Sequence, residues 1–193
     1  MNYTELTNAI KEYTDNTETT FVNNIPNFVR QAEERIYRSI LIPELRKNVT
    51  TSLTTSNRFL AKPTDFLAVF SIAVVDGSSN YSFLLPKDVN FIREAYPATG
   101  TTGLPLYYSQ FDGDNFLLAP TPDSTYTVQL HYYYDPQSIV ASSTSWLGDN
   151  AESTLLYGSL LEAYTFMKGE ADIITFYKTR YDEALEGLRQ LAD

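Results

Sequence analysis

The chain has 193 residues, of which 43% are hydrophobic, so it is long and apolar enough to bury a substantial core as one domain. Its 24 acidic residues outnumber its 14 basic ones, and the formal net charge of -10 argues against a protein that grips nucleic acid by neutralising phosphates. The sequence contains no cysteine, which excludes disulfides, zinc–thiolate sites and a thiol nucleophile.

Helices are expected at the N-terminal end. Asn2 can cap a short helix that reaches Tyr13, because Glu5 follows three positions later as in a capping box. A second helix is predicted over residues 24–40, with Pro26 in its first turn and its end before Pro43. One stripe of this helix is apolar, and its other side carries four charged residues: Arg30, Glu33, Glu34 and Arg38.

The central part of the chain is typical of β structure. Between residues 48 and 135 the hydrophobic period shifts towards two, and Thr, Val, Tyr and Phe are enriched between turn residues. This pattern predicts strands near residues 49–53, 58–61, 68–75, 81–85, 106–111, 115–119 and 126–134. A short helix or helical turn is expected at "PKDVNFIREAY".

Two helices are predicted at the C-terminal end. Asp149 or Asn150 can cap a helix from residue 151 to about residue 168, which Gly169 ends. The last helix runs from Glu170 to the end of the chain, with one apolar side: Ile174, Tyr177, Tyr181, Leu185 and Leu188.

These elements predict an α+β fold in one domain, residues 1–193. Residues 1–47 and 148–193 form a helical bundle, and residues 48–147 form an inserted antiparallel β subdomain. No apolar run approaches the length of a membrane span, and the N-terminus lacks the pattern of a secretion signal. We therefore expect a soluble protein that stays where it is made, with no membrane contact.

An acidic cluster, "DGDN", precedes one of the predicted strands. A calcium loop starting at Asp112 would need an oxygen ligand at its fifth position, a glycine at its sixth and a glutamate at its twelfth. Phe116, Leu117 and Asp123 stand there instead. Asp-Gly between strand-like segments favours a tight hairpin turn, because glycine accepts a positive φ.

Catalytic and metal-binding patterns are not found. His131 is the only histidine, without the partner residues of a metal site, and alternation places it on the strand face of Gln129 and Tyr133. Glu33 and Glu34 are adjacent on a helix and point in different directions, so their spacing does not make an acid/base pair. We expect no enzyme activity, no metal and no cofactor.

The aromatic content is high, with 15 tyrosines and 11 phenylalanines. Two interpretations are equally open from the sequence. These residues form a tyrosine-rich core with hydroxyls reaching the surface, or they form contact surfaces for other molecules.

Six segments together resemble head-to-tail adaptor proteins of tailed phages. They are "NNIPNFVRQAEERIYRSI", "PTDFLAVFSIAV", "KDVNFIREAYP", "LLAPTPDSTYTVQLHYYYDP", "TSWLGDN" and "LLEAYTFMKGE". Their order and spacing cover nearly the whole chain, from about Ile25 to Leu188. Helices at both ends around a central β part also make the architecture similar to that of the tail tubular protein A of short-tailed phages.

The resemblance implies a non-enzymatic virion protein at the head–tail interface, assembled in the host cytoplasm. Such proteins form a homo-oligomeric ring, usually of twelve copies, between the portal protein and a tail or nozzle protein. DNA then passes through the ring without specific binding, and an acidic wall fits this role because it repels phosphate. We expect a monomer or small oligomer in solution and a ring only on the portal.

Candidate partner contacts are inferred from exposure and side-chain chemistry. Asp112, Gly113, Asp114 and Asn115 form the predicted hairpin tip. Trp146, in the loop "SSTSWLGDN", is either a contact anchor or a plug at the base of the C-terminal helices. Leu188 and Leu191 are expected to be partly free, because the last helix overruns the helix before it, and so to dock on the portal.

Functions of other classes also fit part of the pattern. A carbohydrate-binding or receptor-binding virion module could use exposed tyrosines and Trp146 as a stacking surface. A hydrolase acting through carboxylates is a further alternative, although the sequence nominates no acidic pair for it.

Overall fold

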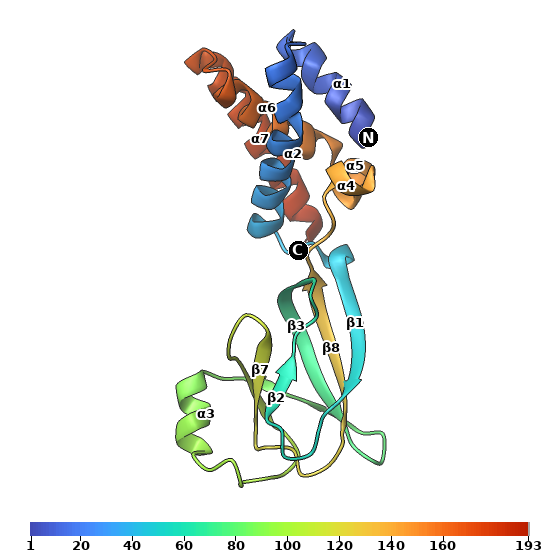
Figure 1. The fold of residues 1–193 in the computed structure, drawn as a ribbon, viewed down its shortest axis with the longest axis vertical. Coiled ribbons are helices and arrows are strands. Elements are labelled where there is room, and N and C mark those ends of the chain that lie inside the picture. Colours follow the sequence, from blue (N-terminus) through green and yellow to red (C-terminus); the bar gives the residue numbers. More distant parts are fainter. Residues whose placement is uncertain (193) are drawn as a thin grey trace. The chain divides into compact units, whose positions relative to one another are not determined.

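The computed structural model describes the backbone of residues 1–192 and the side chains up to Gln190. The chain divides into two compact units: a helical unit made of residues 1–43 together with the described residues from Pro136 onward, and a β unit, Glu44–Asp135. The fold is α+β, as the sequence predicts (Figure 1). The unit boundaries differ from the expected ones, because residues 44–47 belong to the β unit and residues 136–147 belong to the helical unit.

The helical unit is built around one apolar helix. Its elements are α1 (Tyr3–Thr14), α2 (Thr19–Ser39), α4 (Ile139–Ser142), α5 (Trp146–Asn150), α6 (Glu152–Phe166) and α7 (Ala171–Ala192). Helix α6 packs against α1, α2, α5 and α7, and its sequence is apolar on all sides, as expected of a surrounded helix. A Cβ atom at Gly158 would lie 3.1 Å from the Tyr181 ring and 3.2 Å from the Ala32 Cβ. Glycine therefore allows α6 to approach both neighbours closely.

The start of α1 is confirmed, whereas that of α2 was predicted wrongly. Asn2 and Glu5 form the expected capping box, with each side chain accepting the other residue's backbone N–H. Helix α2 begins at Thr19, so Pro26 lies inside the helix rather than in its first turn. Phe21 is buried in the additional residues 19–23, and its burial outweighs the weak helix propensity of the Thr and Asn residues around it.

The ends of α6 also differ in detail from the prediction. Asp149 and Asn150 belong to α5, and the N-cap of α6 is Ala151, without a side-chain hydrogen bond. At the other end Lys168 takes the left-handed conformation, with φ at 55°, instead of Gly169. Gly169 avoids a steric clash, since a Cβ atom there would lie 2.9 Å from a ring carbon of Tyr164.

The β unit contains two four-stranded sheets. Its elements are β1 (Arg46–Ser52), β2 (Phe59–Ala61), β3 (Phe66–Val75), β4 (Tyr81–Phe83), β5 (Leu85–Pro86), α3 (Val89–Ala95), β6 (Tyr107–Gln110), β7 (Asn115–Ala119) and β8 (Thr127–Tyr134), after a 3-10 turn at Pro43–Leu45. The first sheet has the order β1-β8-β3-β4 and the second has the order β2-β7-β6-β5. Neighbouring strands are antiparallel except β5 and β6, which are parallel.

A common core lies between the two sheets. Val128, Leu130 and Tyr132 of β8 contribute to it from the first sheet, and Phe116 and Leu118 of β7 from the second. The alternate residues of β8 face the other way, which confirms the predicted placement of His131, whose ring packs edge-on against Phe70 at 5.2 Å. On the outer side of the second sheet, α3 packs through Ile92 against Leu117 and Ala119.

Candidate interaction surfaces

The hairpin tip, Asp112–Asn115, joins β6 to β7 as predicted, but its glycine has a different role. Gly113 does not adopt a positive φ, so the turn chemistry expected of it is wrong. The Asp112 carboxylate instead accepts the backbone N–H groups of Asp114 at 2.8 Å and Asn115 at 2.6 Å. The Asp114 N–H makes the largest contribution to lowering the pKa of Asp112, with further contributions from Asn115 and the Lys62 charge. The tip is thus an anionic loop whose conformation is held by hydrogen bonds from its own backbone N–H groups to Asp112.

The same acidic cluster has no geometry for a cation. The Asp112 side chain is engaged by the turn itself, and the Lys62 ammonium donates to the Asp112 backbone carbonyl at 2.5 Å. Within residues 1–192, no group of three or more His, Asp or Glu side chains is arranged to hold a metal ion. The tip therefore presents polar and charged groups.

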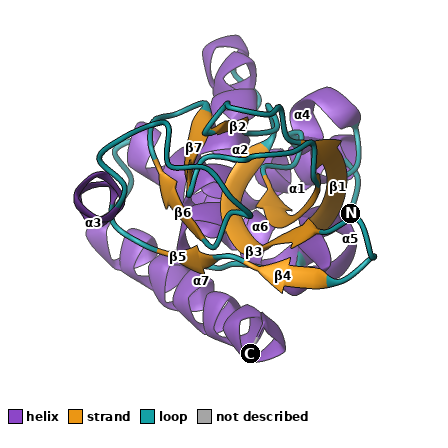
Figure 2. Cartoon of the chain, turned by 90° about the horizontal axis from the view of Figure 1, so that it is seen from below, coloured by secondary structure: helices purple, strands orange, loops and turns teal. Residues whose placement is uncertain are grey.

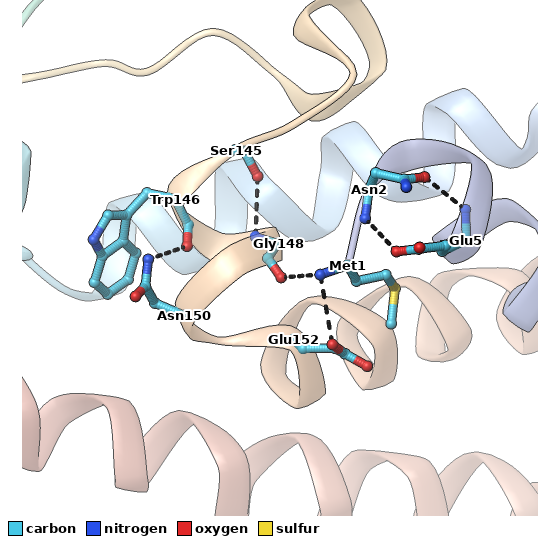
Figure 3. A network of polar contacts seen from close by, with 8 residues as sticks. All are labelled: Met1, Asn2, Glu5, Ser145, Trp146, Gly148, Asn150 and Glu152. Carbon is cyan, nitrogen blue, oxygen red and sulfur yellow. Dashed lines mark hydrogen bonds and ion pairs between the residues drawn. The ribbon is translucent and has the colours of Figure 1, made fainter.

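The segment "SSTSWLGDN" is partly folded into α5 of the helical unit, and five of its residues are exposed: Ser142, Ser143, Thr144, Asp149 and Asn150. Ser145 caps α5 by accepting the Gly148 N–H at 3.1 Å, and Leu147 is fully buried. The Met1 amine donates to the Gly148 carbonyl at 2.6 Å and lies 3.5 Å from the Glu152 carboxylate (Figure 3). A Cβ atom at Gly148 would lie 2.4 Å from the Met1 carbonyl oxygen. The first residue of the chain is thus held directly against α5.

Trp146 is half-buried at the first position of α5. Its backbone carbonyl accepts a hydrogen bond from the Asn150 side-chain amide at 3.0 Å (Figure 3). The indole is drawn away from the Met1 network, so it is not part of those polar contacts. It keeps an accessible surface next to a fixed helical turn.

The C-terminal helix is covered further along its length than the sequence suggests. Leu188 is 4% exposed, so the expectation that it is partly free is wrong. Helix α7 packs against α6, and Leu188 borders a hollow of about 360 Å³ together with Ala184, Gly187 and residues 149–154. Leu191, the other residue expected there, lies outside the described side chains. Phe176, 53% exposed, is an apolar side chain that α7 does present outward.

Sequence reasoning placed Glu33 on the wrong side of α2. Glu33 is 3% exposed, and its carboxylate accepts the Ile139 backbone N–H at 2.9 Å where α4 begins. The spacing was a usable signal, because Glu33 follows Val29 by four residues and precedes Ile36 by three, on the buried stripe. A buried carboxylate in this position joins α2 to the segment that returns from the β unit.

A second polar cluster that the sequence did not reveal lies where the chain enters and leaves the β unit. Asp65 accepts a bond from the Lys47 ammonium at 2.6 Å and from the Tyr132 hydroxyl at 2.8 Å. The Lys47 bond is the main reason that the pKa of Asp65 is lowered. Burial, followed by the bond to Asp65, raises the pKa of Tyr132 to about 12. This cluster ties β1, the start of β3 and the end of β8 together.

A family model described as SU10 adaptor protein matches residues 1–193. The chain belongs to the SU10 adaptor protein family. Membership confirms the resemblance to phage head-to-tail adaptors and supports a structural adaptor role in a bacteriophage virion. No curated protein matches the sequence significantly. None of the described helices is both long and apolar enough to cross a membrane.

The predicted contact residues of this SU10 adaptor protein fall in separate parts of the fold. The hairpin tip belongs to the β unit, whereas Trp146 and Leu188 belong to the helical unit. The β unit also carries an edge stripe that was not singled out from the sequence, made of three side chains more than half exposed: Tyr81, Phe83 and Leu85.

Proposed function

We propose that this protein forms a ring of twelve copies between the portal and the tail of a phage, at the head–tail interface. The ring assembles in the host cytoplasm, gives the tail or nozzle protein a platform and lets DNA pass without specific binding. The observation that carries this proposal is the match to the SU10 adaptor family over residues 1–193.

The charge of the chain supports a conduit role. Acidic residues outnumber basic ones in both units, and the whole chain has a formal net charge of -10. Surfaces of this sign repel phosphate, by the same electrostatics through which basic surfaces retain DNA. The same charge opposes bringing many copies together unaided, so the portal serves as the template for the ring.

The presence of two units with different surfaces supports a platform role. A ring with rotational symmetry needs two different complementary surfaces on each copy, and an adaptor needs further surfaces for the portal and the tail. The β unit offers a polar hairpin tip and exposed aromatic side chains, and the helical unit offers Trp146 and α7. The protein acts in this proposal without catalysis, metal or cofactor.

Electron microscopy of reconstituted complexes tests the proposal. Purified portal rings of the same phage, mixed with the protein, should gain an extra layer of density with twelve-fold symmetry, while light scattering of the protein alone should report a monomer or small oligomer. Portal rings that stay undecorated at saturating protein would contradict the adaptor ring. Micromolar binding of duplex DNA at physiological salt would contradict the conduit.

Trp146 is our proposed contact with the tail protein. Trp146→Ala should leave the protein folded and bound to the portal but should weaken tail attachment, because large aromatic side chains dominate contact energies. Phe176→Ala, which removes an exposed aromatic side chain from α7, is the matched control. Loss of folding in Trp146→Ala would instead assign the indole to the core of the helical unit.

A further inference from the structure

One edge of the β unit carries an unusually apolar pair of strands. In the edge stripe, Tyr81 is 55% exposed, Phe83 is 63% exposed and Leu85 is 57% exposed. Leu84, between the last two, is 5% exposed and belongs to the core, so the three stripe residues face outward. Residues 77–86 contain no charged side chain. Edge strands normally carry charges or bulges that prevent pairing, and this edge lacks charges.

The opposite edge of the same unit is hollow. Strands β1 and β2 are the other terminal strands of the two sheets, so they lie across the unit from β4 and β5 (Figure 2). A groove of about 410 Å³ lies along them, and Leu53, Leu60 and Leu130 contribute buried apolar surface to it. Val49, 37% exposed, and Phe59, 41% exposed, also line it. We call this feature the β1–β2 groove.

The chemistry of the two edges is complementary. The three apolar side chains, at alternate positions of the extended segment 81–85, can contact the apolar part of the groove's lining. Polar residues, among them Thr51 and Asn57, make up the rest of that lining. The charged side chain among the groove's lining residues is Lys62, whose ammonium already donates to the Asp112 carbonyl. The edge stripe brings no charge that would compete for this hydrogen bond.

We propose that the edge stripe of one copy docks in the β1–β2 groove of the next copy, which makes this pair of surfaces the subunit contact of the ring. The inference rests on the proposed ring function and names the surfaces that build it. Because the two surfaces lie on opposite edges of one unit, the contact is heterologous, and repetition around an axis can close a ring.

The size of the contact explains why a template is needed. The three side chains of the edge stripe can each bury roughly 100 Å² more, about half the area of a large side chain. That total is well below the roughly 800 Å² per partner of a stable protein interface. A contact of this size is weak between freely diffusing copies. It becomes effective when a scaffold holds two copies as neighbours, because the second encounter is then intramolecular.

The absence of cysteine from the sequence allows a clean crosslinking test. A Val49→Cys/Phe83→Cys double variant carries one thiol in the groove and one on the stripe. Under mild oxidation, both on portal rings and in concentrated solution, it should form a ladder of disulfide-linked oligomers. A mixture of the two single variants should form heterodimers and nothing larger, because each copy then has one thiol. The control pairs Val49→Cys with Phe91→Cys, since Phe91 is 41% exposed on α3 of the same unit, and it should crosslink far less.

Three outcomes would overturn the inference. One is a double variant that stays monomeric on non-reducing gels in both samples. Another is single variants that each form homodimers while their mixture gives no more heterodimer than chance, which would indicate an isologous contact. The third is a Phe91→Cys control that crosslinks as strongly as Phe83→Cys. Decoration of portal rings by the unmodified protein is measured separately, so a failed crosslink on decorated rings rejects this contact and leaves the adaptor function standing.

Discussion

The two units of the molecule differ in how many of their large apolar side chains are exposed. Thirteen large hydrophobic residues are exposed among the described side chains, and nine of them belong to the β unit: Val49, Phe59, Leu67, Phe70, Tyr81, Phe83, Leu85, Phe91 and Leu106. In the helical unit, α6 is surrounded by helices, and α7 buries its apolar stripe. The helical unit covers most of its apolar side chains with its own helices and leaves four large ones exposed, whereas the β unit has more apolar surface suited to cover by other molecules.

The sharpest test of this difference compares two phenylalanines of the β unit. Phe116 is 0% exposed between the sheets, and Phe66 and Tyr108 pack edge-on against it at 5.4 Å and 5.9 Å. Phe116→Ala should lower the free energy of unfolding by about 3–5 kcal/mol, measured by chemical denaturation. Phe83→Ala should change it by no more than about 0.5 kcal/mol, because its ring is already largely in water. A large loss in Phe83→Ala would assign the edge stripe to the fold instead of to a partner.

A second test breaks the tight packing of the helical unit. Gly158→Leu forces a side chain between α6, Ala32 and Tyr181, and should cost about 1–3 kcal/mol in thermal or chemical unfolding. Gly187→Leu on α7 is the matched control, since a Cβ there meets nothing within 4 Å. It should be neutral or should stabilise by up to about 1 kcal/mol, because glycine is a poor helix former. Equal losses in both variants would show that close approach at Gly158 is unimportant.

The smallest expected effect concerns acid stability of the β unit. Asp65 has a pKa below its ordinary value of 3.8, so its stabilising contribution is present above that value and is lost as the pH falls through the lowered pKa. Asp65→Asn should flatten this acid-side decline and cost less than about 1 kcal/mol at neutral pH, because the ion pair with Lys47 is partly exposed. Unfolding curves measured across the acid range check both points.

A control separates this effect from other carboxylates whose pKa is lowered. Asp112 has its own lowered pKa from bonds at the hairpin tip, so Asp112→Asn should also remove part of the acid dependence. The two effects should add, because Asp65 and Asp112 share no bonding partner. If Asp65→Asn leaves the acid-side slope unchanged, the Lys47 bond does not stabilise the fold.

The sequence predicted the helices and strands better than it predicted which of them pack together. Alternation in β8 located the strand and its buried face correctly, because a period of two reflects burial of one side of a sheet. It could not place Leu188, since α7 packs against α6, and the other residues around Leu188 include positions 149–154, far earlier in the chain. Glu33 was misplaced because charge was given more weight than position on the helix. The edge stripe and the β1–β2 groove depend on strand order, which no local pattern specifies.

Which tyrosines are buried and which are exposed is also visible only in the structure. Tyr37, Tyr177 and Tyr181 are buried in the helical unit, and Tyr132 and Tyr133 are buried in the β unit. Tyr13 and Tyr81 are exposed. Both interpretations of the sequence therefore apply, to different tyrosines, and composition could not assign them individually.

The entry and exit of the β unit lie on neighbouring strands. Arg46, near its start, pairs with Tyr133 near its end, and the Asp135 N–H donates to the Asp65 carbonyl at 2.7 Å. An insert whose two ends are this close can be removed, replaced or transplanted as one cassette, because the host needs only a short bridge in its place. We therefore expect that residues 44–135 can diversify, or be produced alone as a compact β protein, while the helical unit keeps its own packing.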